Sequence, residues 1–239
     1  MKTLFIGDIH GLSGWEEIAL DGLTKHYKVI FLGDYVDSFF VPELEIYENL
    51  KDIINFKKKH PEVTLLIGNH DYAYMYAKSA CSGYNHKMAY SYRELFKNNW
   101  DLFDVAWGHT NLATKKYTLA THAGLTNTYW GKFVKSYINN ELKHIPITEI
   151  YNTMHETLNY LKDRVTLLWK VGSIRGGVGT GGVLWADYSE VINDLYHGIN
   201  QVFGHTPKSS ISVDKFGDDL VVCVDNWGNR QIVSIILDL

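Results

Sequence analysis

Cysteine and arginine are both scarce in this sequence. Only two cysteines, Cys81 and Cys223, occur among 239 residues, so a disulfide framework is excluded. The 23 basic residues, of which four are arginines, are outnumbered by 27 acidic ones, and the net charge is −4. A protein that binds nucleic acid through phosphate contacts is usually more basic than this, so we expect no nucleic-acid partner.

Long apolar runs are also missing. No run reaches the ~18 residues that a membrane-spanning helix needs, and the apolar start at Thr3–Ile6 is too short for the core of a secretory signal. We therefore expect a cytoplasmic protein without a membrane partner. Hydrophobic residues still make up 46% of the chain, enough for a substantial core, and we expect a single domain over residues 1–239.

What the sequence does contain is a recurring short apolar run, followed within two or three residues by a side chain able to bind metal. These runs are continuous rather than alternating, which is typical of strands in a sheet that is covered on both faces. The predicted strands are Thr3–Ile6, Val29–Leu32, Val63–Ile67, Tyr117–Ala120 and Gln201–Phe203.

Helical patterns fill the intervals between these runs. The sequence from Ser13 to Glu16 has the pattern of a capping box before a helix that ends near His26, and Asp187 begins another. Pro42 precedes an apolar stripe with helical spacing. We also expect a largely helical insertion at about residues 72–107, a helix over Thr148–Lys162, and a hairpin of strands Leu220–Asp225 and Arg230–Leu237 joined by Asn226–Asn229. This mixture predicts an α/β fold with an antiparallel contribution.

The polar residues after the strands combine carboxylate, amide and imidazole groups. Ligands of these kinds, without thiolate, suit Mn, Fe or Zn. Because ligand crevices in such sheets lie beyond the carboxyl ends of the strands, we expect these residues to converge. They are Asp8, His10, Asp34, Asn69, His70, Asp71, His122 and His205.

Six motifs in order resemble a known family. Through them the sequence is similar to the calcineurin-like metallophosphoesterase superfamily, and to its phosphoprotein phosphatase branch, which includes serine/threonine phosphatases and diadenosine tetraphosphate hydrolases. The resemblance implies an α/β, four-layer fold with a central mixed β-sandwich flanked by α-helices. The motifs are Gly7-Asp8-Ile9-His10-Gly11, Gly33-Asp34-Tyr35-Val36-Asp37, Gly68-Asn69-His70-Asp71, Thr121-His122-Ala123-Gly124, Leu184-Trp185-Ala186-Asp187 and Val202-Phe203-Gly204-His205-Thr206-Pro207.

The resemblance also implies two divalent metal ions, which we expect to be Mn²⁺, with Fe or Zn as alternatives. One metal would be bound by Asp8, His10 and Asp34. Asp34 would bridge to the second metal, and the remaining ligands of that metal would be Asn69, His122 and His205. A hydroxide between the two cations would attack phosphorus.

Further roles are implied for residues beside the metals. His70 would act as general acid, oriented by Asp71. Asp37 would either hydrogen-bond to a metal ligand without binding metal itself or cap a helix. The phosphatase branch normally has a phosphate-binding arginine where this chain has Ser38. Arg175, near the Leu-Trp-Ala-Asp motif, is our candidate for binding substrate phosphate, with Arg93 as a substitute for the missing arginine.

Three functions remain open from the sequence. The first is a phosphomonoesterase that acts on a phosphorylated protein, favoured because Pro207 stands where many phosphodiesterases carry a second histidine. The second is a nucleotide hydrolase that cleaves a dinucleoside polyphosphate. The aromatic residues between Tyr72 and Trp107 would either stack on its base or pack in a helical core. The third is a weakened metal-binding scaffold, supported only by Ser38. Gly172–Gly182 is either a mobile loop bordering the site or a connector, and the sequence does not indicate an oligomeric state.

Overall fold

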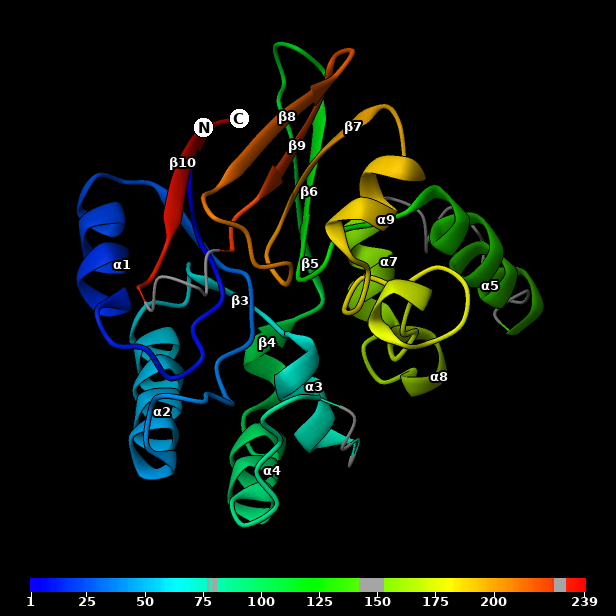
Figure 1. The fold of residues 1–239 in the computed structure, drawn as a ribbon. Coiled ribbons are helices and arrows are strands. Elements are labelled where there is room, and N and C mark those ends of the chain that lie inside the picture. Colours follow the sequence, from blue (N-terminus) through cyan, green and yellow to red (C-terminus); the bar gives the residue numbers. More distant parts are fainter. Residues whose placement is uncertain (77, 79–80, 142–152, 226–230) are drawn as a thin grey trace. The chain divides into compact units, whose positions relative to one another are not determined.

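Two mixed β-sheets, each accompanied by helices, make up the fold (Figure 1). The computed structural model describes residues 1–76, 78, 81–141, 153–225 and 231–239. Within these residues the chain forms two compact units, and each contains one five-stranded sheet. Unit 1 comprises Met1–Asp104, Pro207–Ile211 and Val224–Leu239, and unit 2 comprises Val105–Thr206 and Ser212–Cys223. The two mixed sheets with flanking helices confirm the predicted α/β class.

The sheet of unit 1 has the strand order β10-β1-β2-β3-β4. Strands β1 to β4 run parallel, and β10 runs antiparallel to β1, so that Leu4 pairs with Val29 on one side and Ile236 on the other. The parallel strands are almost wholly buried, which explains their uninterrupted apolar sequences. The strands are β1 (Lys2–Ile6), β2 (Lys28–Phe31), β3 (Thr64–Leu66), β4 (Phe103–Asp104) and β10 (Ser234–Asp238).

The first two helices of unit 1 pack together through aromatic rings. The ring of Trp15 in the first helix contacts Phe31 of β2 and Phe56 of the second helix, with centroids 5.7 and 5.4 Å apart. The second helix has acidic residues in its first turn and three lysines in its last, which suits the helix dipole. The helices are α1 (Trp15–Thr24), α2 (Glu43–Lys59), α3 (Asn69–Met75), α4 (Ala89–Lys97) and the 3-10 turn η1 (Trp100–Leu102).

The sheet of unit 2 has the order β5-β6-β7-β9-β8. Its three central strands are parallel, and its two edge strands are antiparallel to their neighbours. The core beside this sheet packs Val191 of α9 with Phe203 of β7 and Val221 of β9. The strands are β5 (Ala106–Thr110), β6 (Tyr117–Thr121), β7 (Ile199–Phe203), β8 (Ser212–Phe216) and β9 (Asp219–Cys223). The helical elements are η2 (a π-helix, Tyr129–Val134), α5 (Lys135–Glu141), α7 (Met154–Tyr160), α8 (Val165–Leu168), η3 (Ser173–Arg175) and α9 (Tyr188–Asn193).

The five strands predicted to precede the metal-competent residues are all present, each within two residues of its expected limits, whereas the last predicted strand, Arg230–Leu237, begins only at Ser234 as β10. The capping box at Asp187 is confirmed, because the Asp187 and Glu190 side chains bond to each other's backbone amides. The predicted box at Ser13 is wrong. Gly14 takes the cap position there with a φ of 94°, and no side chain caps α1.

The predicted hairpin at the end of the chain is also wrong. Strand β9 pairs with β7 and β8, whereas β10 pairs with β1 in the other sheet. An apolar run identifies a strand but does not identify its partner. The expected turn Asn226–Asn229 lies outside the described residues, as does the start of the helix expected over Thr148–Lys162, of which α7 is the described part.

The helical stretch expected at 72–107 is shorter than predicted. The end of α3, helix α4 and the turn η1 fall within it, but β4 begins at Phe103 and β5 at Ala106. None of the described helices is both long and apolar enough to cross a bilayer.

Candidate metal centre

Three metal-competent side chains converge in unit 1. Asp8 and His10 follow β1, and Asp34 follows the neighbouring parallel strand β2. Each offers one ligand atom, and these atoms all lie within 4.8 Å of one another. All three side chains are buried. Adjacent parallel strands end at the same edge of the sheet, and this edge is where an α/β fold places its ligands.

The backbone at these positions is unusual. His10, Asp34 and Asp37 have φ values of 45°, 51° and 62°, in the left-handed region that non-glycine residues seldom adopt. Such conformations cost about 1–3 kcal/mol each and persist only where the surroundings enforce them. Here the amides of Ile9 and His10 both donate to the Asp34 carbonyl, at 3.1 and 2.7 Å. The two strand-end loops are therefore tied together, with their side chains directed at one place.

Two glycines allow the close approach of these loops. Gly33 has a φ of 108°, and a Cβ there would lie 2.6 Å from the amide nitrogen of Gly68. A Cβ on Gly68 would lie 2.0 Å from the Asp34 carboxylate. The glycines that precede Asp34 and Asn69 in the motifs are thus required by packing between the loops.

The ring of His10 is prepared for coordination. Its Nδ1 lies 3.1 Å from the Val36 carbonyl and 2.8 Å from the Asp37 carbonyl, so Nδ1 carries the proton. The other nitrogen, Nε2, lies 3.8 Å from the Asp34 carboxylate. Burial lowers the pKa of His10 to about 4, against the opposing effect of the Asp34 charge. A neutral imidazole with its second nitrogen fixed by a carbonyl is the usual form of a histidine ligand.

The N-terminus of α3 adds further residues to the same unit. Asn69 is buried at the first position of the helix, and the His70 amide donates to the Asp34 carboxylate at 3.0 Å. The Asp71 carboxylate accepts from the amides of Tyr35 at 2.8 Å and Gly68 at 2.9 Å. Asp71 therefore fixes the loop after β2 to the loop after β3.

The His70 ring has a different partner from the one predicted. In the part of the chain that the structure describes, the carboxylate in contact with this ring is Asp37, whose Oδ2 lies 2.9 Å from Nδ1. We expected Asp71 in this role, and the structure replaces it with Asp37. Burial opposes a charge on His70, but Asp34 and the bond to Asp37 outweigh it and raise the pKa of His70 to about 9. His70 can therefore hold a proton at neutral pH.

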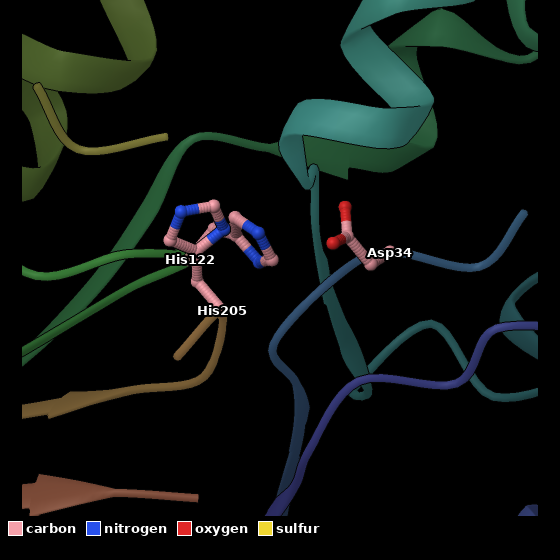
Figure 2. Close-up of side chains that lie close together, drawn as sticks. All are labelled: Asp34, His122 and His205. Carbon is pink, nitrogen blue, oxygen red and sulfur yellow. The ribbon is translucent and has the colours of Figure 1, made fainter. Parts of the chain in front are cut away.

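His122 and His205 lie together in unit 2. They follow the parallel neighbours β6 and β7, and their rings are 5.0 Å apart at an interplanar angle of 68°. Both are buried, and His205 has a φ of 64°. The Gly204 amide donates to the His122 carbonyl at 2.8 Å, which holds the two strand ends side by side. Figure 2 shows these two rings at the ends of their strands, and also the Asp34 carboxylate of unit 1.

Arg175 lies beside this histidine pair. It ends the short turn η3 in the glycine-rich segment, and its guanidinium lies 3.2 Å from the Thr206 hydroxyl and 3.4 Å from the His205 carbonyl. It also forms an ion pair with Asp187 at 3.0 Å. The segment that carries it is closed by a bond from the Ser173 amide to the Gly179 carbonyl at 2.8 Å.

The other arginine candidate, Arg93, lies on α4 in unit 1. Its Nε donates to the Tyr74 carbonyl at 3.0 Å, so it braces α3 against α4. Ser38, where the branch has an arginine, accepts bonds from the amides of Phe40 and Val41 at 3.2 and 3.3 Å. Ser38 thus shapes the turn that leads to α2.

A buried set of carboxylate and imidazole groups beyond the ends of parallel strands is typical of metal-dependent enzymes. The model of the calcineurin-like phosphoesterase family matches residues 1–226. The chain therefore belongs to this family, as its motifs indicate, and is a metal-dependent phosphoesterase. No curated protein matches the sequence.

Solved structures share the fold. One is a cold-active protein tyrosine phosphatase, with a TM-score of 0.58, 14% identity, and coverage of 99% of this chain and 73% of that chain. Another is the cold-active protein-tyrosine phosphatase of a psychrophile, Shewanella sp., with a TM-score of 0.50, 14% identity, and coverage of 92% and 70%. At this identity the likeness concerns the fold alone.

Proposed function

We propose that this protein is a two-metal phosphomonoesterase that acts on phosphorylated proteins, in the manner of the serine/threonine protein phosphatases. The observation that carries the proposal is the cluster of Asp8, His10 and Asp34 with the ring of His70 beside it, bonded to Asp37. Membership of the phosphoesterase family supports the hydrolytic chemistry. Two structural neighbours are named as protein tyrosine phosphatases, so the fold itself is one that hosts hydrolysis of phosphoproteins.

The residues fit a pair of divalent cations. Asp8, His10 and Asp34 would hold the first, because two carboxylates and one neutral imidazole suit Mn²⁺, with Fe or Zn as alternatives. Asp34 would also serve the second cation. The other ligands of this cation would be Asn69, His122 and His205, a role supported by their chemistry and their place in the family's motifs. When bound, such a pair supplies Lewis acidity to the phosphoryl group and lowers the pKa of water.

The protein's own residues contribute proton transfer and binding. His70 gives its proton to the oxygen that leaves phosphorus, a contribution of roughly 10²–10⁴-fold in rate. Asp37 holds the His70 ring by its bond to Nδ1, so Nε2 is the atom that donates. Asn69 contributes an amide donor for a phosphoryl oxygen.

Arg175 is the proposed phosphate-binding cation. It already lies beside the backbone of His205 in unit 2. An arginine can grip phosphate through two parallel hydrogen bonds, which a serine at position 38 does not provide. Arg93 remains the alternative, with its Nε bonded to the Tyr74 carbonyl in unit 1.

A panel of substrates tests the proposal. Purified protein is stripped of metal, reloaded with Mn²⁺, and offered phosphoseryl and phosphotyrosyl peptides, a dinucleoside polyphosphate and an aryl phosphodiester. We expect the highest kcat/KM on a phosphopeptide and no turnover without metal. A higher kcat/KM on the dinucleoside polyphosphate would make the protein a nucleotide hydrolase. Bound metal with no turnover of any substrate would favour a scaffold.

A further inference from the structure

Asp37 is held at both carboxylate oxygens. Its Oδ2 receives the hydrogen bond from the His70 ring at 2.9 Å, and its Oδ1 accepts a hydrogen bond from the Tyr74 hydroxyl. Asp37 follows β2 and Tyr74 lies on α3, both within unit 1. Each oxygen therefore has a separate partner, and the carboxylate has one fixed orientation.

The Tyr74 hydroxyl is itself fixed. The backbone amide of Asn85 donates to it at 2.6 Å, so the hydrogen of the Tyr74 hydroxyl is directed to Asp37. The Tyr74 ring stacks on Tyr84, with centroids 4.4 Å apart and planes 11° apart, and meets Tyr92 edge-on at 4.9 Å. Its side chain is 0% exposed. These contacts hold both the ring and the hydroxyl.

We propose that Tyr74 is a positioning residue, which holds Asp37 so that the His70 ring is aimed at the leaving-group oxygen. This inference rests on the proposed function, because it assumes that His70 donates the proton. The sequence alone favours core packing for Tyr74, and the ring does pack in the core. Its hydroxyl in addition holds the Asp37 carboxylate.

The energetics favour such a role. A buried carboxylate that loses one of two partners is left with an unsatisfied oxygen and is able to rotate toward another donor. Burial and the charge of Asp37 raise the pKa of Tyr74 far above its ordinary value, so its hydroxyl remains a donor at any working pH. Phenylalanine at this position would keep the stacked ring and remove only the donor.

Leaving-group dependence separates positioning from general structural support. Proton donation matters most when the departing oxygen is basic, as in phenyl phosphate, and least when it is a weak base, as in 4-nitrophenyl phosphate. We expect Tyr74→Phe to lower kcat on phenyl phosphate by about 10–100-fold and on 4-nitrophenyl phosphate by about threefold or less. KM and bound metal should stay unchanged.

Tyr92→Phe is the matched control. It removes a hydroxyl from the same aromatic cluster, one that donates to the Glu43 carbonyl at 3.2 Å. We expect Tyr92→Phe to leave the ratio of kcat on phenyl phosphate to kcat on 4-nitrophenyl phosphate unchanged. Equal losses on both esters in Tyr74→Phe, no loss at all, or the same change in Tyr92→Phe would overturn the inference.

A second measurement does not depend on turnover. The Nδ1 proton of His70, assigned by its loss in His70→Asn, is observed by NMR in the Zn²⁺-loaded protein, because Zn²⁺ is diamagnetic whereas Mn²⁺ would broaden resonances near the site. We expect this resonance to shift or broaden in Tyr74→Phe and to persist in Tyr92→Phe. If Tyr74→Phe does not fold, 3-fluorotyrosine at position 74 keeps the ring and strengthens the donor, and the resonance should shift. An unchanged resonance overturns the inference, whereas a wild-type protein that hydrolyses no monoester overturns the proposed function alone.

Discussion

The backbone amide of His70 donates a hydrogen bond of 3.0 Å to the carboxylate of Asp34. The bond joins the proposed general acid to the residue proposed to bridge the metals, through the first turn of α3. A helix N-terminus carries partial positive charge, which stabilises the carboxylate placed there. The same contact fixes the His70 backbone beside the proposed metal-binding cluster of Asp8, His10 and Asp34.

Asp34→Asn should abolish activity. The change removes the negative charge that two cations would share in the proposed site, and an amide is a poor bridging ligand. We expect kcat/KM to fall at least a thousandfold and the bound metal to fall below two ions per chain, measured by elemental analysis alongside kinetics. Asp52→Asn, on an exposed position of α2, is the control and should match the wild-type protein. Full metal content with full activity in Asp34→Asn would remove Asp34 from the site.

His70→Asn should separate proton transfer from metal binding. The ring is not among the proposed ligands, so metal content should stay unchanged, while turnover should fall by a hundredfold or more. His86→Asn, at an exposed histidine of the same unit, serves as the comparison. If His70→Asn turns over at the wild-type rate, His70 has no part in the mechanism.

The sequence predicted the strand ends well because each ligand motif follows a continuous apolar run, as at β1 and β2. It did not identify the partner of His70. Asp71 is adjacent in sequence, but its carboxylate accepts from the amides of Tyr35 and Gly68, which leaves Asp37 for the His70 ring. Which of two carboxylates reaches a ring depends on loop conformation, and the left-handed φ of Asp37 has no local signature in the sequence.

The errors in the fold have a similar origin. The tail was expected to form a hairpin because its two apolar runs are close in sequence, yet β10 pairs with β1 and β9 with β7. Pairing with strands from distant parts of the chain depends on the whole topology. The end of β9 at Cys223 and the β10 contact with β1 are therefore findings of the structure alone.

Gly68→Ala should damage the metal-binding cluster through packing. The added Cβ would lie 2.0 Å from the Asp34 carboxylate and 2.4 Å from its amide nitrogen, so the loop after β2 must move. We expect a loss of about 1–3 kcal/mol in the free energy of unfolding and a weaker affinity for Mn²⁺. Gly131→Ala is the matched control, because a Cβ there meets nothing within 4 Å. Thermal unfolding and metal titration report the two effects, and equal behaviour of the two variants would contradict the packing argument.

Arg175→Lys should weaken substrate binding. Lysine keeps the charge but loses the planar pair of donors, and it cannot reproduce both the contact with Thr206 and the ion pair with Asp187. We expect KM for a phosphopeptide to rise about tenfold, and inhibition by inorganic phosphate to weaken in parallel. Arg164→Lys, at an exposed arginine of the same unit, should leave both unchanged. An unchanged KM in Arg175→Lys would leave phosphate binding to another group.

Acid stability should depend on Asp219 at the start of β9. Burial opposes its charge, but hydrogen bonds from Lys116, from the Gly198 amide at 3.0 Å and from the His197 ring at 3.2 Å outweigh this and lower the pKa of Asp219. A carboxyl whose pKa is lower in the folded state stabilises the fold at every pH above the pKa that the group has in the unfolded state, about 4. That contribution is lost as the pH falls through the folded pKa.

Asp219→Asn should therefore lower the free energy of unfolding at pH 7 by about 1–2 kcal/mol. The measurement is a lower midpoint of urea unfolding. The difference in urea midpoint between the variant and the wild-type protein should become smaller as the pH falls toward 3. The neighbouring exposed Asp218 provides the control, since Asp218→Asn should leave the midpoint unchanged at both pH values. A gap that is as wide at pH 3 as at pH 7 would show that the effect of Asp219→Asn comes from packing rather than from charge.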